Sequence, residues 1–331
     1  MPAENLLERS DMGPALVMPP SDGEHLWLPH GDGVKATIKI SPETFPVNIV
    51  SFGTLTLPKG TAYGEPIYHR GDIIYFIEEG VGELVLDDVR YDVAPGSTAY
   101  VGRMTRHAFH NRGERNLRLT WTNLPPGPER LLRRIGKPAN GPYPHFSDEE
   151  RAIAEAVADW YGGPRELMGM AHSKGICIVM DPEDGASFWQ PNPTGGYITV
   201  KLSPYNIPSN MLAFGIQQVG PGGLLPNHSH SRNEELKYVW KGTGRARVNG
   251  QEAIAVPGTT VFTGRWVEHE FQADSDGPLT ITWLIFPAGL ENLLTGIGRP
   301  RKPGQPHPGD FALPDNLMGL LDEAGFGPVS I

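Results

Sequence analysis

The stretch GGLLPNHSHSRNEELKYVWKG, residues 222–242, contains the pattern His-x-His-x4-Glu-x6-Gly. The pattern starts at His228, continues with His230, and includes Glu235. Residues two apart on a β-strand point to the same face, so both histidines can project into one interior. A carboxylate from the next strand and a third imidazole, that of His269, would complete a convergent set of nitrogen and oxygen ligands. The sequence therefore predicts one divalent metal per chain, held by His228, His230, Glu235 and His269.

Two adjacent acids, Glu234 and Glu235, compete for the carboxylate position. Glu235 keeps the six-residue spacing to Gly242, so we assign it to the metal and expect Glu234 to face outward. Lys237 shares the strand parity of Glu235. It is therefore a candidate to bind an acidic or phenolic substrate oxygen and, together with Glu235, to move a proton. The open alternative is an edge lysine whose ammonium extends to water.

Aromatic residues supply the candidates for an apolar substrate wall. Phe271 shares the strand parity of His269 and is predicted to line the interior beside it. Trp283 and Phe262 are further candidates for substrate contact. For these two residues, and for Trp266, ordinary core packing is the competing interpretation.

The two halves of the chain repeat one another without a gap. The offset is 162 residues, the distance in sequence from His107 to His269. Matched positions include Trp27 with Trp189, Phe52-Gly53 with Phe214-Gly215, Pro95-Gly96 with Pro257-Gly258, Gly102-Arg103 with Gly264-Arg265, and Thr120-Trp121 with Thr282-Trp283. A shared register over so many Gly, Pro and Trp positions indicates a duplicated domain.

Each copy has the composition of short β-strands joined by tight turns. Segments rich in β-branched and aromatic residues, bounded by Gly, Pro or Asn, are predicted strands: 72–79, 82–86, 236–240 and 279–285. Asp87-Asp88 and Asn249-Gly250 fall at equivalent places and are predicted hairpin turns. Helices are expected at 147–161, with Ser147 as N-cap and Glu150 three residues later, and at 314–324.

A second pattern identifies a resemblance. Pro257-Gly258 is followed, eleven residues after the glycine, by His269. Together with the first pattern, this resembles the two motifs of the cupin superfamily, although Ala273 stands where that family often has Asn. The duplication resembles a bicupin, which implies an all-β fold of two tandem cupin (double-stranded β-helix, jelly-roll) barrels with a short helical segment after each. The expected domains are an N-terminal barrel at 1–146, a helical linker at 147–171, and a C-terminal barrel with the metal site at 172–331.

The first repeat lacks most of the ligands. At the positions of His228, His230 and Glu235 it has Pro66, Tyr68 and Ile73, and only His107 is retained. His69 has the wrong strand parity and would reach the interior only through a bulge. We expect a degenerate, metal-free first barrel, with an unusual His69/His107 site as the alternative.

The resemblance extends to several chemistries, because cupins with three histidines and a glutamate include dioxygenases, oxalate-type decarboxylases, isomerases and lyases. Our first expectation is an Fe(II) dioxygenase that acts with O2 on an aromatic, enol or diketone-type small molecule. The architecture also resembles gentisate and quercetin dioxygenases. Mn, Ni, Cu and Zn suit the same ligands. The alternatives are a Mn- or Zn-dependent isomerase, decarboxylase or lyase that uses the metal as a Lewis acid, and a non-catalytic small-molecule-binding bicupin.

Charge and hydropathy argue against nucleic acid and membranes as partners and leave a small-molecule substrate. The net charge of -10 opposes binding to a nucleic-acid backbone, and no run approaches the roughly 18 apolar residues of a membrane span. The N-terminus has no secretory signal, so we expect a cytoplasmic protein. The single cysteine, Cys177, cannot form an internal disulfide and is interpreted as a small buried apolar residue. A homodimer is expected, because exposed sheet faces are commonly covered by pairing.

Overall fold

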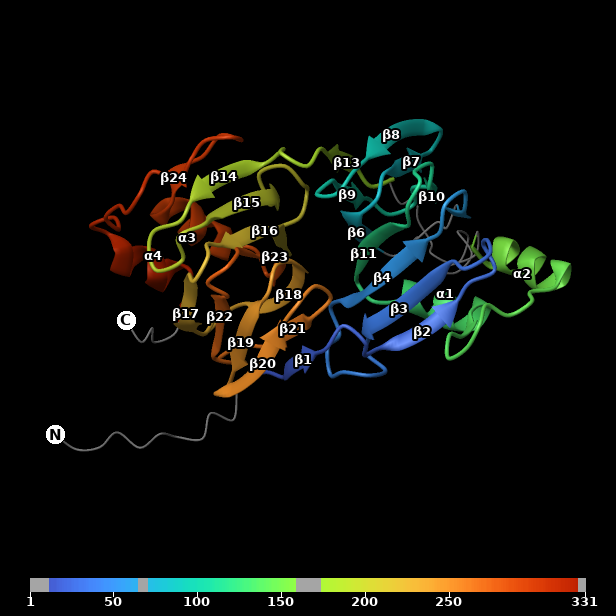
Figure 1. Ribbon diagram of the computed structural model, residues 1–331, viewed down its shortest axis with the longest axis horizontal. Helices are drawn as coiled ribbons and strands as arrows, with labels where there is room; N and C mark the ends of the chain where they lie inside the picture. The colour runs from blue at the N-terminus through green and yellow to red at the C-terminus, as the bar shows by residue number, and fades with distance from the viewer. Residues whose placement is uncertain (1–11, 65–70, 159–173, 327–331) are drawn as a thin grey trace. The chain divides into compact units, whose positions relative to one another are not determined.

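In the computed structural model the chain forms two compact units (Figure 1). The N-terminal unit is Asp22–Asp184, and the C-terminal unit combines Met1–Ser21 with Gly185–Ile331. The structure describes residues 12–64, 71–158 and 174–326.

The N-terminal unit contains one larger and one smaller antiparallel sheet. In spatial order, the larger sheet consists of β12 (Lys137–Pro138), β2 (Glu24–Trp27), β3 (Lys35–Ile40), β4 (Ser51–Leu57), β11 (Leu117–Leu124), β6 (Asp72–Glu79), β9 (Thr98–Val101) and β13 (Cys177–Met180). The smaller sheet consists of β5 (Ala62–Tyr63), β10 (His107–His110), β7 (Gly82–Leu86) and β8 (Val89–Val93). Side chains from both sheets, among them Trp121 from the larger and Phe109 from the smaller, share one apolar core.

The C-terminal unit repeats this plan. Its larger sheet consists of β1 (Ala15–Met18), β21 (Thr260–Thr263), β18 (Glu234–Lys241), β23 (Leu279–Phe286), β16 (Ala213–Val219), β15 (Tyr197–Leu202), β14 (Ala186–Trp189) and β24 (Arg299–Pro300). Its smaller sheet consists of β17 (Leu224–His228), β22 (His269–Ala273), β19 (Gly244–Val248) and β20 (Gln251–Ala255). The predicted all-β class and the two jelly-roll repeats are thereby confirmed.

The strand that precedes each repeat belongs to the sheet of the other repeat. β1 pairs with β21, with Ala15 opposite Thr263, and β13 pairs with β9, with Cys177 opposite Val101. Each added strand covers backbone groups that would otherwise form an open sheet edge. The compact units consequently have different bounds from the expected domains 1–146 and 172–331.

Four helices occur in the described residues: α1 (Pro128–Ile135), α2 (Asp148–Ala158), α3 (Leu290–Ile297) and α4 (Leu317–Glu323). The predicted capping box is present before α2, because the Ser147 amide donates to Glu150 and the Glu150 amide donates to the Ser147 hydroxyl. Residues 159–161 of the predicted helix lie outside the described residues. α4 starts at Leu317 rather than at Pro314.

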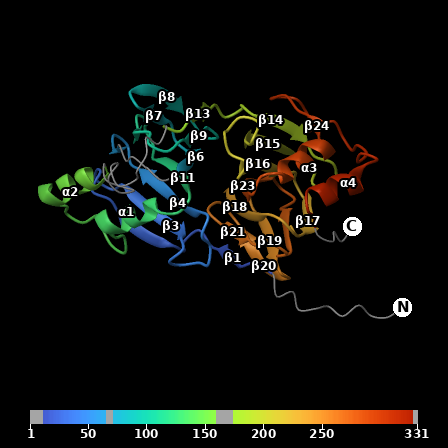
Figure 2. The same cartoon turned by 180° about the vertical axis from the view of Figure 1, so that it is seen from behind.

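Helices α1 and α3 were not predicted from the sequence. Both begin after a glycine, and Pro128 opens α1, where its missing N–H costs no hydrogen bond. α3 and α4 lie side by side in the C-terminal unit (Figure 1 and Figure 2). None of the described helices is long and apolar enough to cross a membrane.

The two predicted hairpin turns are confirmed. Asp87 and Asp88 join β7 to β8, and Asn249 and Gly250 join β19 to β20. All four have positive φ, from 41° to 77°, as a two-residue type I′ turn requires. The residues tolerate this conformation because Asn, Asp and Gly enter the left-handed region at low cost.

Candidate metal centre

Four buried side chains meet between the two sheets of the C-terminal unit. His228 ends β17 and lies opposite His269 on β22, in the smaller sheet. Glu235 comes from β18 in the larger sheet, and His230 lies in the short connection before it. Their potential ligand atoms all lie within 4.8 Å of one another. The exposed fractions of His228, His230, Glu235 and His269 are 5, 2, 4 and 0%.

Backbone carbonyls set the tautomers of two histidines. Nδ1 of His228 lies 2.6 Å from the Pro226 carbonyl oxygen, and Nδ1 of His269 lies 3.0 Å from that of Val267. A carbonyl only accepts, so each Nδ1 carries the proton and each Nε2 presents a lone pair. Such second-shell bonds are the usual way to orient metal-binding imidazoles.

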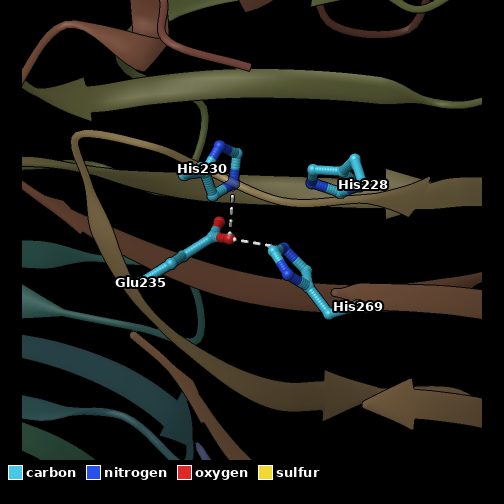
Figure 3. A group of neighbouring side chains, drawn as sticks. All are labelled: His228, His230, Glu235 and His269. Atoms are coloured by element: carbon cyan, nitrogen blue, oxygen red, sulfur yellow. Dashed lines mark hydrogen bonds and ion pairs between the residues drawn. The ribbon is translucent and has the colours of Figure 1, made fainter. Parts of the chain in front are cut away.

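Acceptor atoms that face one another at the centre suit a divalent cation. Nε2 of His269 lies 3.1 Å from Oε2 of Glu235, and Nε2 of His230 lies 3.4 Å from the same oxygen. Figure 3 shows the Glu235 carboxylate between these two rings, with His228 alongside. Both ring nitrogens of His230 are buried without a hydrogen bond in the described part of the chain. A divalent metal would satisfy these acceptors together, because neutral imidazoles and a carboxylate are its ordinary ligands.

The protonation states of the two histidines and of Glu235 also favour a divalent metal. Burial lowers the pKa of His269 to about 4 and that of His228 well below its usual value, with nearby positive charge adding to both effects. Burial by itself would raise the pKa of Glu235, but the Lys237 ammonium and the two histidine contacts outweigh it and hold that pKa well below its usual range. His269 and His228 are therefore neutral at pH 7 and Glu235 is ionised, as metal binding requires.

Lys237 points into the interior rather than to water. Its side chain is buried, its ammonium contacts Oε2 of Glu235, and Nζ lies 5.7 Å from the centre of the Phe271 ring. Burial lowers the pKa of Lys237, and the carboxylate of Glu235 opposes this shift. Of the two interpretations that the sequence left open, the structure therefore shows the inward lysine.

Strand register shows on which side of each sheet the aromatic candidates for substrate contact lie. Phe271 is buried on the same side of β22 as His269. Trp283 pairs with Lys237 and so shares its side of the larger sheet. Its indole lies over Gly215, and it packs in an apolar cluster with helix α3.

Phe262 and Glu234 both lie on the face of the larger sheet that points away from the site. Phe262 pairs with Leu236, so it lies on the face of the sheet opposite Glu235 and packs against Phe286, with ring centroids 6.0 Å apart. The prediction that Phe262 lines the site is wrong, because side chains alternate along a strand. Glu234 pairs with Phe286 on that same outer face and is partly exposed, as expected.

One of the described residues at the site was not predicted from the sequence. Phe326 stacks on His228, with ring centroids 4.9 Å apart and an interplanar angle of 7°, and it meets His230 edge-on at 5.0 Å. It follows the terminal helix, far along the chain from either motif. The only signal nearby is Gly325, a typical helix-ending glycine, and this residue does not indicate what comes next to it in space.

The N-terminal unit has no equivalent cluster in its described residues. His107 is buried there and its Nε2 accepts a hydrogen bond from Tyr75, while Ile73 occupies the carboxylate position. His69 lies outside the described residues. Cys177 is half-buried, packs against the apolar core and contacts Thr105.

A comparison with models of protein families finds the same domain in both repeats. A family model described as "Cupin domain" matches residues 53–123 and again 215–285. The two matches begin 162 residues apart, the same offset as the sequence repeat. No curated protein matches the sequence.

Several solved structures share the fold at low identity. A putative glyoxylate induced protein from Pseudomonas aeruginosa is 15% identical, with a TM-score of 0.58 over 86% of this chain and 92% of that one. Bacillus subtilis oxalate decarboxylase, studied for its Mn(II) centres, is 15% identical, with a TM-score of 0.55 over 82% and 76%. Procruciferin, an 11S globulin from Brassica napus, is 13% identical, with a TM-score of 0.59 over 86% and 87%. At these identities the likeness concerns the fold alone.

Proposed function

This chain is a bicupin, with one cupin domain in each repeat, and on that premise we propose that it is a metal-dependent enzyme. Its C-terminal unit would hold one divalent metal through His228, His230, Glu235 and His269. The observation that carries the proposal is the set of buried acceptor atoms that face one another around a single point. Lys237 neutralises the Glu235 carboxylate, but the ring nitrogens of His230 stay buried without a hydrogen bond in the described part of the chain, which is costly.

Within this class we propose an Fe(II) dioxygenase for an aromatic, enol or diketone-type small molecule. Iron would supply the redox chemistry that lets such a substrate react with O2, and four protein ligands leave one or two positions open. Phe271 contributes an apolar surface from which water is excluded. The substrate would add both atoms of O2, so no further reductant is needed.

Lys237 has two roles in this proposal. In the metal-free protein its ammonium neutralises Glu235, with which it is in contact. A bound metal would take over that neutralisation and leave the ammonium available to a substrate oxygen. The ammonium would then bind the anionic oxygen of an enolate, phenolate or carboxylate, because a hydrogen bond between two charged groups is stronger than a neutral one.

A second candidate is a Mn- or Zn-dependent decarboxylase, isomerase or lyase. The Lys237–Glu235 pair favours it, because a buried ammonium beside a carboxylate can move a proton to or from a substrate carbon. The Mn(II) centres of the structurally similar oxalate decarboxylase agree with that metal. A non-catalytic small-molecule-binding bicupin is the third candidate.

Two experiments separate these candidates. The metal content of anaerobically purified protein is measured for the wild type and for His228→Ala. One metal per chain in the wild type, lost in the variant, supports the site, and full retention in the variant contradicts it. Nitric oxide is then added to the Fe(II)-loaded protein. An iron–nitrosyl signal together with substrate-dependent O2 uptake supports the dioxygenase, and turnover without O2 uptake supports the second candidate.

We further propose that the protein is a cytoplasmic homodimer. Strand β20 supports pairing, because it ends the smaller sheet of the C-terminal unit and its Ile254 is largely exposed. Sedimentation of the purified protein tests the dimer, and a monomer at micromolar concentration would contradict it. Fractionation of the source cells tests the location.

A further inference from the structure

The segment after helix α4 lies against the connection that carries His230. Phe326 and His230 form an antiparallel β-bridge. Next to this bridge, the backbone amide and the hydroxyl of Ser231 both donate to the Gly325 carbonyl, at 2.7 and 2.8 Å. The segment is thus fastened to the chain immediately beside a metal-ligand candidate.

Gly325 is needed for this arrangement. Its φ is +67°, and a Cβ at this position would lie 2.8 Å from the Ser231 hydroxyl and 2.9 Å from Cγ of Arg232. The glycine ends the helix in the left-handed conformation and turns the chain toward the site. The turn therefore delivers the next side chain, that of Phe326, to the histidine cluster.

One phenyl ring then covers two imidazoles. It lies parallel to His228 and edge-on to His230, while the Pro226 carbonyl holds the edge of the His228 ring through Nδ1. Phe326 is partly exposed, whereas both histidines are buried. The ring therefore lies between the cluster and solvent, at the rim of the site.

We propose that Phe326 is a positioning residue of this centre and the cover on its solvent side. It fixes the plane of the His228 imidazole, so that Nε2 faces the other ligands, and it slows the passage of solutes to the cluster. The first role rests on the proposed metal site. The second concerns access to the histidines, and it is testable in the metal-free protein.

The test uses Phe326→Ala and Phe326→Leu, with Phe311→Ala as the matched control. Phe311 belongs to the same unit and also stacks on a histidine, His307, with centroids 6.3 Å apart, but it is not among the residues around the metal site. Phe326→Leu keeps apolar volume and removes the flat ring. Circular dichroism and thermal unfolding verify that each variant is folded. If neither Phe326 variant folds, Ser231→Ala is used instead. It removes the hydrogen bond from the Ser231 hydroxyl to the Gly325 carbonyl and keeps the phenyl ring, and the same two readouts are applied to it.

The first readout is modification of the histidines in metal-free protein. Diethyl pyrocarbonate is added, and the rate at which His228 and His230 react is followed by mass spectrometry. Phe326→Ala should raise this rate about 10-fold, because the reagent would then reach the histidines without local opening of the segment, whereas Phe311→Ala should leave it unchanged. Equal rates in the wild type and Phe326→Ala would overturn the role as cover.

The second readout is the release of Mn(II) to a chelator. Both Phe326 variants should release the metal about 10-fold faster than the wild type and Phe311→Ala. Unchanged release from a folded Phe326→Leu would overturn the positioning role. A wild type that binds no metal would contradict the proposed function instead, and the modification experiment would still decide whether Phe326 covers the histidines.

Discussion

The Tyr75 hydroxyl donates a hydrogen bond to Nε2 of His107, over 2.7 Å, in the interior of the N-terminal unit. At the repeat offset of 162 residues, these positions correspond to Lys237 and His269 of the C-terminal unit. Nδ1 of His107 lies 3.3 Å from a backbone carbonyl, as Nδ1 of His269 does in its own unit. The tyrosine therefore satisfies the imidazole nitrogen that a metal would otherwise use.

This relationship predicts one metal per chain. His107→Ala should retain the wild-type metal content, whereas His269→Ala should lose affinity by more than the 10- to 100-fold that is typical of losing an outer-shell partner. Metal analysis after equilibrium dialysis measures both variants. Loss of metal from His107→Ala, with the fold intact, would show that the first barrel also contributes a site.

The same histidine predicts a pH dependence of stability. Burial lowers the pKa of His107 from 6.5 to about 4, so the folded unit excludes a proton that the unfolded chain binds between these values. Stability from this group is complete above pH 6.5 and is lost as the pH falls toward 4. The shift corresponds to about 3 kcal/mol in the free energy of unfolding.

Comparison with His107→Gln isolates this effect. His30, whose pKa burial also lowers to about 4, contributes with the same sign in both proteins. Urea unfolding between pH 7 and pH 4 should therefore give a shallower loss of stability for the variant than for the wild type. Parallel curves would exclude His107 as the source.

Adjacent glutamates provide a matched pair of substitutions. Glu235→Gln should remove metal binding, because it replaces the buried carboxylate by a neutral amide that is a poor ligand. Glu234→Gln should keep full metal content, because Glu234 lies on the other face of the strand. Isothermal titration with Mn(II) measures both, and equal effects would refute the assignment of Glu235.

Lys237 should matter more to turnover than to metal content. Lys237→Gln is expected to lower kcat/KM by about 100-fold or more, in line with the loss of a general acid–base group, and to retain the metal. Lys241→Gln is the control, since this lysine lies on the same strand but is exposed. An unchanged kcat/KM in Lys237→Gln would exclude the substrate role.

Loss of the ammonium should also destabilise the metal-free protein selectively. Without Lys237 the buried Glu235 has no strong counter-charge among the described residues, and breaking a buried ion pair typically costs about 3–5 kcal/mol. A bound metal would supply the missing charge. Thermal unfolding should therefore show a larger effect of Lys237→Gln without metal than with it, and equal shifts would contradict this account.

Strand parity yields a prediction for two phenylalanines. Phe271→Leu should raise KM for the substrate, because Phe271 lies on the site's side of β22. Phe262→Leu should leave KM unchanged while lowering stability by about 1 kcal/mol, since it only alters packing on the opposite face. Steady-state kinetics and urea unfolding of both variants test this difference.

Much of the fold and of the site could be predicted from the sequence because the signals are local. The 162-residue repeat revealed two copies of one domain, and the spacing of His228, His230 and Glu235 predicted which side chains would share an interior. Within a single strand, side chains alternate by geometry, so counting residues predicted that Glu235 would point inward and made Lys237 a candidate to do so.

Tertiary structure alone decided the features that depend on pairing between distant segments. The face of Phe262 depends on its register with Leu236, and the place of β1 depends on its pairing with β21. Phe326 reaches His228 only because the residues directly after α4 fold back along the motif. Spacing in the sequence does not encode such contacts, since they arise when separate elements pack together and bury their surfaces.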